Sequence, residues 1–63
     1  MCEASVYIEK DGTEELILES VGVLEDQGGE VRMLSIFGEE KRLKARIKRF
    51  ALVNHRIVLE PAD

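Results

Sequence analysis

RLKARIK, residues 42–48, alternates cations with apolar residues at every position. A period of two is typical of a β-strand with one buried face. It directs the two kinds of side chain to opposite faces: Leu43, Ala45 and Ile47 inward, and Arg42, Lys44, Arg46 and Lys48 outward. The stretch therefore favours a strand, and with it an all-β fold.

A helix is the competing interpretation of the same stretch. Leu43, Ile47 and Phe50 recur at helical spacing, and Glu39-Glu40 would suit a helix N-terminus. We prefer the strand because the alternation is unbroken and because hairpin signals follow it. These signals are a short apolar segment at Ala51–Val53, a turn at Asn54-His55, a second segment at Arg56–Glu60, and then Pro61, which has no N–H to donate.

Turn residues divide the rest of the chain into short segments, as is typical of a β-meander or a small barrel. The turns are expected at Asp11-Gly12, Gly22, Gly28-Gly29 and Gly38, and the strands at Ser5–Glu9, Glu15–Ser20, Val21–Asp26 and Val31–Phe37. The sequence predicts a single domain over residues 1–63, a small SH3-like antiparallel barrel of about five to six short strands.

Side-chain alternation also predicts which faces of these strands are buried. Val6 and Ile8 should share one face of the first strand, and Leu16 and Leu18 one face of the second. The segment Val31–Phe37 carries apolar residues at both odd and even positions, so we expect it to be covered on both sides.

The charge balance is acidic overall but locally basic. The net charge is −4 and the pI about 4.9, which argues against a nucleic-acid binder. Six of the nine basic residues nevertheless lie between Lys41 and Arg49. They form either a solvated face neutralised by neighbouring acids or a weak RNA-binding face, with Tyr7 or Phe37 as a stacking platform. The RNA-binding interpretation would use Lys41, Arg42, Lys44, Arg46 and Lys48.

The start of the chain lacks a basic, apolar signal segment, and no apolar run reaches the length of a membrane helix. We therefore expect a cytoplasmic protein that does not bind a membrane, in which a lone thiol stays reduced. Catalytic motifs are sparse. A Cys2–His55 nucleophilic pair would lack an orienting residue, and no serine lies in a nucleophile motif, so we expect no enzymatic activity.

Cys2, the only cysteine, has two interpretations. It is either a small buried hydrophobe or a metal ligand. The amine of Met1, the amide nitrogen of Cys2 and its thiolate are spaced to close two five-membered chelate rings on one ion. Removal of Met1 would leave one ring. Ni(II) or another soft or borderline divalent metal accepts such a planar nitrogen–sulfur set, whereas Ca²⁺ and Mg²⁺ prefer oxygen ligands.

One N-terminus supplies at most part of a planar donor set, so two termini meeting across a two-fold axis would complete it. A short chain also gains stability by pairing, and the symmetric dimer is the commonest oligomer. We therefore expect a homodimer whose contact uses apolar residues of Val31–Phe37 and Leu52. His55 would join or tune the site only if the last hairpin folds toward the N-terminus.

Several of these features together resemble the CooT family. They are Met1-Cys2 before an alternating strand, the Asp11-Gly12 hairpin, Phe37-Gly38-Glu39-Glu40, and the closing stretch Leu52–Leu59. The resemblance implies a small nickel-binding accessory protein of carbon monoxide dehydrogenase maturation, a homodimer of barrel-like subunits that binds nickel through Cys2. Members are also labelled predicted RNA-binding proteins. The Met-Cys start is similar to HypC-type chaperones too, but Glu3-Ala4-Ser5 departs from their apolar continuation.

Overall fold

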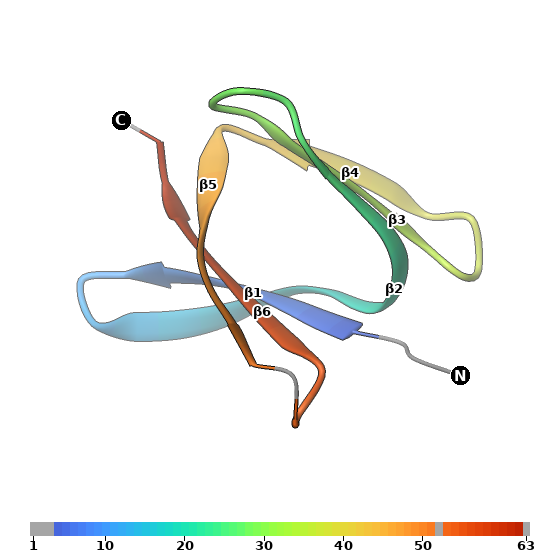
Figure 1. Ribbon diagram of the computed structural model, residues 1–63, viewed down its shortest axis with the longest axis horizontal. Coiled ribbons are helices and arrows are strands. Elements are labelled where there is room, and N and C mark those ends of the chain that lie inside the picture. Colours follow the sequence, from blue (N-terminus) through green and yellow to red (C-terminus); the bar gives the residue numbers. More distant parts are fainter. Residues whose placement is uncertain (1–3, 52, 63) are drawn as a thin grey trace.

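The computed structural model describes residues 4–51 and 53–62, which form one six-stranded sheet without a helix (Figure 1). The strands are β1 (Ala4–Lys10), β2 (Thr13–Asp26), β3 (Val31–Ser35), β4 (Glu40–Leu43), β5 (Ala45–Ala51) and β6 (Arg56–Pro61). Their order across the sheet is β4-β3-β2-β1-β6-β5. The all-β prediction and the expected number of strands are confirmed. Within the described residues no helix is long and apolar enough to cross a membrane.

The segment at 42–48 is extended, as predicted, but it is two strands rather than one. β4 ends at Leu43, which pairs with Val31, and β5 begins at Ala45, which pairs with Pro61. These two strands lie at opposite ends of the sheet, so the single residue Lys44 links its two edges. No strand pairing between β4 and β5 is found in the described chain. Hydrogen bonds therefore do not close the curled sheet into a barrel, and only the backbone at Lys44 connects its two edges.

One pairing departs from the antiparallel expectation. β1 and β6 are parallel, with Ser5–Ile8 beside Arg56–Leu59, whereas the other four pairs are antiparallel. The reason is the connection at Lys44, which turns a corner without a hairpin. The chain then reverses direction once more at the β5–β6 turn, which brings the last strand parallel to the first.

β2 merges the two strands expected at Glu15–Ser20 and Val21–Asp26. Its first half pairs with β1 and its second half with β3. Between them Ser20 has a positive φ of 57°, and the registers with both neighbours shift near Val21. A bulge of this kind bends a strand and strengthens its twist. The bend at Ser20 is therefore what carries one long strand around the curve of the sheet.

A second irregularity in β2 reverses one predicted face. Val6 pairs with Leu18 but the next residue, Tyr7, pairs with Leu16, so Ile17 is an extra residue on β2. An extra residue moves all side chains beyond it to the opposite face. Leu18 is accordingly buried, whereas Leu16 is 43% exposed, and the prediction that they share a face is wrong. On β1, which has no extra residue, Val6 is buried and Ile8 packs against the same core, as expected.

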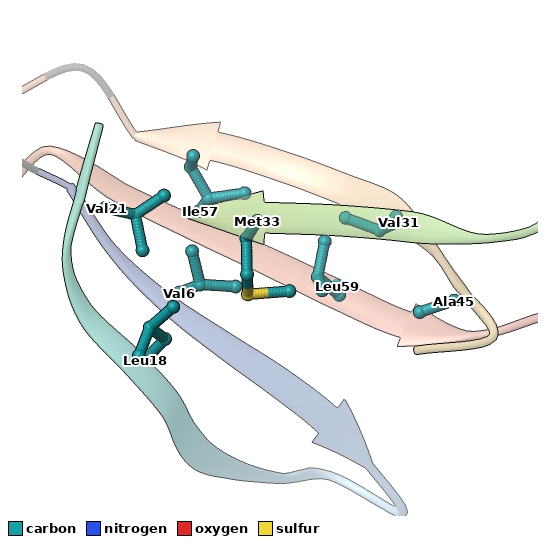
Figure 2. Close-up of a cluster of buried hydrophobic side chains, with 8 residues drawn as sticks. All are labelled: Val6, Leu18, Val21, Val31, Met33, Ala45, Ile57 and Leu59. Atoms are coloured by element: carbon teal, nitrogen blue, oxygen red, sulfur yellow. The ribbon is translucent and has the colours of Figure 1, made fainter. Parts of the chain in front are cut away.

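The core lies inside the curl and takes side chains from most strands (Figure 2). Its buried members are Val6, Leu18, Val21, Val31, Met33, Ala45, Ile57 and Leu59, with Leu43 of β4 packed against them. Met33, fully buried, lies in the middle of the set. Val58 is buried too, but it does not belong to this cluster. It pairs with Tyr7 on one side and Arg49 on the other, on the opposite face of the sheet.

The segment Val31–Phe37 is not a strand covered on both sides. β3 stops at Ser35, and the next residues form a turn in which Phe37 is 81% exposed. Gly38, with a φ of 92°, allows this turn. The expected turn at Asp11-Gly12 is confirmed: both residues have positive φ, 55° and 79°, as the tight hairpin turn that matches strand twist requires.

Candidate functional site

The proposed metal ligands, Met1 and Cys2, lie outside the described residues, but the strand that follows them is in place. Ala4 pairs with Val21 at the bend of β2. The backbone amide of Ser5 donates a hydrogen bond of 3.0 Å to the carbonyl of His55. The start of β1 therefore lies between the bend of β2 and the β5–β6 turn.

His55, the only histidine of the chain, lies in that β5–β6 turn. Its side chain is exposed, and its backbone has a positive φ of 49°. The last hairpin does fold toward the N-terminal strand, which is the condition under which His55 could join a site there. Ser5 is three residues from Cys2, and three extended residues span at most about 11 Å.

The described part of the chain has no cluster of side chains that could enclose a metal ion. Among residues 4–51 and 53–62, no group of three or more His, Cys, Asp and Glu side chains is arranged to hold a metal ion. The acidic residues are numerous, but several of them form ion pairs with cations, among them Glu9, Glu14, Glu40 and Glu60. Cys2 therefore remains the candidate ligand that the sequence singles out.

The basic segment does not form one exposed cationic face. Lys41 donates through Nζ to the carbonyl oxygen of Ile17 at 3.1 Å. Arg42, Arg46 and Lys48 each lie within 3.3 Å of a carboxylate oxygen, in Glu40, Glu60 and Glu9 respectively. Lys44, at the corner between β4 and β5, has no side-chain partner among the described residues. The arrangement matches a solvated face that neighbouring acids neutralise.

A network of ion pairs extends across the outer face of β1, β2, β5 and β6. Glu14 accepts from Arg49 at 2.8 Å and from Arg56 at 2.9 Å, and Arg49 also reaches Glu9 at 3.2 Å. The hydrogen bond from Lys48 is the main reason that the pKa of Glu9 lies below its ordinary value, with the Arg49 charge acting in the same direction. The network connects strands that are far apart in the chain, so no local sequence pattern predicts it.

A smaller charged cluster lies on β2, β3 and β4. Arg32 bridges Glu40 at 2.8 Å and Glu25 at 3.1 Å. The hydrogen bond between Arg32 and Glu40 lowers the pKa of the carboxyl and raises the pKa of the guanidinium. Glu40 accepts from Arg42 as well, which further lowers its pKa.

The two aromatic rings considered as stacking platforms have different surroundings. The guanidinium of Arg56 lies over the ring of Tyr7 at 4.2 Å from the ring centre, a cation–π contact that covers one face of the ring. Phe37 is open to solvent. Its exposure was missed because an apolar run looks alike in a buried strand and in a turn, although Gly38 after it was a signal for the turn.

The four most exposed large apolar side chains of the described residues lie in two places. Ile36 and Phe37 lie in the β3–β4 turn, while Phe50 on β5 and Val53 in the β5–β6 turn are 58% and 93% exposed. Leu52, expected at a dimer contact, lies outside the described residues. Its neighbours Phe50 and Val53 place an exposed apolar surface next to the turn that contacts Ser5.

Comparison with known proteins gives matches over nearly the whole chain. Residues 1–60 match the family described as CO dehydrogenase accessory protein CooT. The fold is similar to a crystal structure described as CooT from Carboxydothermus hydrogenoformans, with a TM-score of 0.90 and 47% sequence identity. That similarity covers 98% of this chain and 100% of the other. No curated protein matches the chain.

Proposed function

Because the chain belongs to the CooT family of CO dehydrogenase accessory proteins, we propose that it binds Ni(II) through Cys2 and delivers it during maturation of a nickel enzyme. The client that the family description suggests is carbon monoxide dehydrogenase. The observation that carries the proposal is the family match over residues 1–60, which includes the Met1-Cys2 start. An accessory role of this kind needs no catalytic group in the chain itself.

The donor chemistry at the chain start supports nickel as the cargo. The Cys2 thiolate and adjacent backbone nitrogens form a nitrogen–sulfur set of the kind that Ni(II) accepts in planar geometry. These donors must lose protons before they bind, so uptake should weaken as the pH falls. A cytoplasmic location, where the thiol stays reduced, is part of the proposal.

We place the dimer contact at Phe50 and Val53 rather than along β3. These residues are exposed and adjoin the β5–β6 turn, which contacts Ser5 near the chain start. A two-fold axis passing near this turn would bring two chain starts together, so each subunit would supply half of a planar site. Phe50→Ser should then weaken both dimerisation and nickel binding.

Nickel titration tests the proposal directly. Ni(II) is added to the wild type, Cys2→Ser and Cys2→Ala while the near-ultraviolet thiolate-to-nickel absorption band is recorded. The wild type should develop the band and bind tightly, and both variants should lose the band. If Cys2→Ser binds nickel with the same spectrum and affinity, Cys2 is not the ligand and the proposal fails.

Sedimentation tests the dimer, again with a matched pair of variants. Phe50→Ser should sediment as a monomer at concentrations where the wild type is a dimer, whereas Phe37→Ser, on the β3–β4 turn, should remain dimeric. Adding Ni(II) should shift the wild type toward the dimer, because binding to the paired form stabilises it. A monomeric wild type with one nickel per chain would contradict the shared site.

The RNA-binding alternative receives no support from the geometry. Of the residues that it would use, Lys41, Arg42, Arg46 and Lys48 already bond to carbonyl or carboxylate oxygens within the chain. Fluorescence polarisation with labelled RNA at low and high salt would still detect it. Binding that weakens steeply as salt rises would favour this alternative over the nickel-delivery proposal.

A further inference from the structure

β2 has an open edge over its first half. The pairing of β2 with β3 covers only Val21–Asp26, so the side of Thr13–Glu19 that faces away from β1 has no strand beside it in the described chain. Lys41, which bonds to the carbonyl oxygen of Ile17, is the contact that the structure gives to this edge. An unpaired strand edge is a template for an added strand unless something covers it.

A groove of about 330 Å³ runs along this edge, between β2 and the β3–β4 turn. Its lining mixes apolar and polar side chains: Leu16, Ile17, Leu18 and Phe37, with Glu19, Glu39, Ser20 and Ser35. Phe37 offers the largest exposed apolar surface in it. An extended segment that displaced Lys41 from the Ile17 carbonyl would find backbone partners on β2 and an aromatic side chain at the same time.

The turn that presents Phe37 is held in place from inside. Ser35 is buried, and its hydroxyl oxygen accepts hydrogen bonds from the backbone amides of Phe37 at 3.1 Å and Glu39 at 3.0 Å. The amide of Ile36 donates to the carbonyl of Ser20 at 2.8 Å, which ties the turn to the bend of β2. A groove wall fixed in this way loses little conformational entropy on binding.

The charges of the groove select among possible occupants. Glu19 and Glu39 have no ion-pair partner among the described residues, whereas Glu9, Glu14, Glu40 and Glu60 are all paired. Unpaired carboxylates beside the exposed side chains of Leu16 and Phe37 favour a ligand that carries cations next to apolar side chains. In an extended segment the two kinds of side chain alternate.

We propose that the open edge of β2 and its groove bind an extended segment of a partner protein in which apolar residues alternate with lysine or arginine. The segment would add as a strand beside Thr13–Glu19, pack an apolar side chain on Phe37, and place cations near Glu19 and Glu39. Nothing in this requires bound nickel, so the surface would operate in the metal-free protein.

The test uses metal-free full-length protein and a short fluorescein-labelled peptide of alternating isoleucine and lysine. Fluorescence polarisation should show binding of this peptide, weaker binding of an isoleucine–glutamate peptide, and weaker binding of the lysine peptide N-methylated along one edge. N-methylation removes the donors that strand addition needs. Equal binding of the lysine and glutamate peptides, or no loss on N-methylation, would overturn the proposal.

Matched variants locate the surface. Phe37→Ser should weaken binding of the lysine peptide about tenfold, as expected when a central aromatic contact is truncated, whereas Phe50→Ser should leave it unchanged. Glu19→Gln combined with Glu39→Gln should weaken binding and reduce its salt dependence, with Glu30→Gln as the control. Undiminished binding to Phe37→Ser would place the peptide elsewhere.

Further measurements distinguish loss of the groove contact from misfolding and from self-association. Far-ultraviolet circular dichroism and urea unfolding establish that each variant is folded, and Ser35→Ala offers an independent way to loosen the turn without removing Phe37. Sedimentation distinguishes a partner segment from a second copy of this chain. If Phe37→Ser turns a dimer into a monomer, the groove is a self-association surface and the partner proposal is wrong.

Discussion

The amide nitrogen of Ser5 lies 3.0 Å from the carbonyl oxygen of His55, although fifty positions of sequence separate the two residues. This bond lies at one end of the parallel pairing of β1 with β6. It brings the β5–β6 turn, with its histidine and the exposed Val53, to the strand that follows Cys2. The dimer axis proposed above rests on this contact, because it brings the β5–β6 turn beside the start of β1.

Substitutions of His55 should distinguish the effect of its backbone conformation on stability from the effect of its imidazole on nickel binding. Its positive φ is unfavourable for most residues, so His55→Gly should raise the free energy of unfolding by up to about 1 kcal/mol, and His55→Val should lower it by about 1–2 kcal/mol. Urea unfolding measures both. Equal effects of Gly and Val would contradict the backbone explanation. Nickel titration of the folded His55→Gly variant then shows whether the imidazole contributes to the site.

Met33 is the residue whose truncation should damage the core most. It is fully buried in the middle of the cluster, so Met33→Ala should lower the free energy of unfolding by about 2–5 kcal/mol. A domain of this size has a total stability of only several kcal/mol, so this variant could be unfolded at room temperature. Met33→Leu, which nearly conserves volume, should cost less than about 1.5 kcal/mol. Similar losses for Ala and Leu, measured by urea unfolding, would argue against tight packing at this position.

Ser35→Ala should loosen the β3–β4 turn specifically. The change removes the acceptor for the amides of Phe37 and Glu39 and should lower the free energy of unfolding by about 1–3 kcal/mol. Hydrogen exchange read by NMR should show faster exchange at these two amides. The amide of Gln27, which donates to Glu30 in the β2–β3 turn, serves as an internal control. Unchanged exchange at Phe37 and Glu39 would mean that the hydroxyl is dispensable.

Stability should fall as acid protonates Glu9 and Glu40. Hydrogen bonds from Lys48 and Arg32 hold the pKa of these carboxyls below the ordinary value of 4.5. Because the unfolded chain then binds protons more readily, their contribution is present above about pH 4.5 and is lost as the pH falls through the lower folded-state values. Urea unfolding between neutral and acidic pH should show this decline.

The matched variant is Glu9→Gln combined with Glu40→Gln. It should be less stable than the wild type at neutral pH, with a shallower loss on acidification, and the difference should shrink at high salt because these pairs are exposed. Parallel pH profiles for the wild type and the variant would show that other carboxyls dominate the acid response.

Local pattern was sufficient for the type of most elements, although the turn expected at Gly22 is wrong because Gly22 lies within β2. Alternation at 42–48 predicted extended backbone, and Asp11-Gly12 and Gly28-Gly29 predicted turns that need positive φ, which both positions have. Cys2, the candidate ligand, also came from sequence, because its donors are neighbours along the backbone. The strand and turn predictions succeed because the forces behind them act over a few residues, whereas the role of Cys2 as a ligand stays a prediction.

The buried face of each strand and the residues at which strands end were less predictable. One extra residue in a strand moves every later side chain to the opposite face of the sheet. Ile17 on β2 separated Leu16 from Leu18, and Lys44 divided a uniform alternation into strands at opposite edges. Nothing in the local pattern marks either residue as irregular. Each irregularity allows the sheet to curl around a shared core, which is a property of the whole sheet.

By itself, the sequence determined that this chain forms short strands and tight turns and that it carries a cysteine beside its first residue. Only the tertiary structure decided that β1 lies beside β6, that the acids and cations at 9, 14, 49 and 56 meet, and that one edge of β2 stays open. The physical reason is the distance along the sequence over which the deciding interactions act. Backbone conformation follows from neighbouring residues, whereas strand pairing depends on which distant segments can bury their apolar faces together.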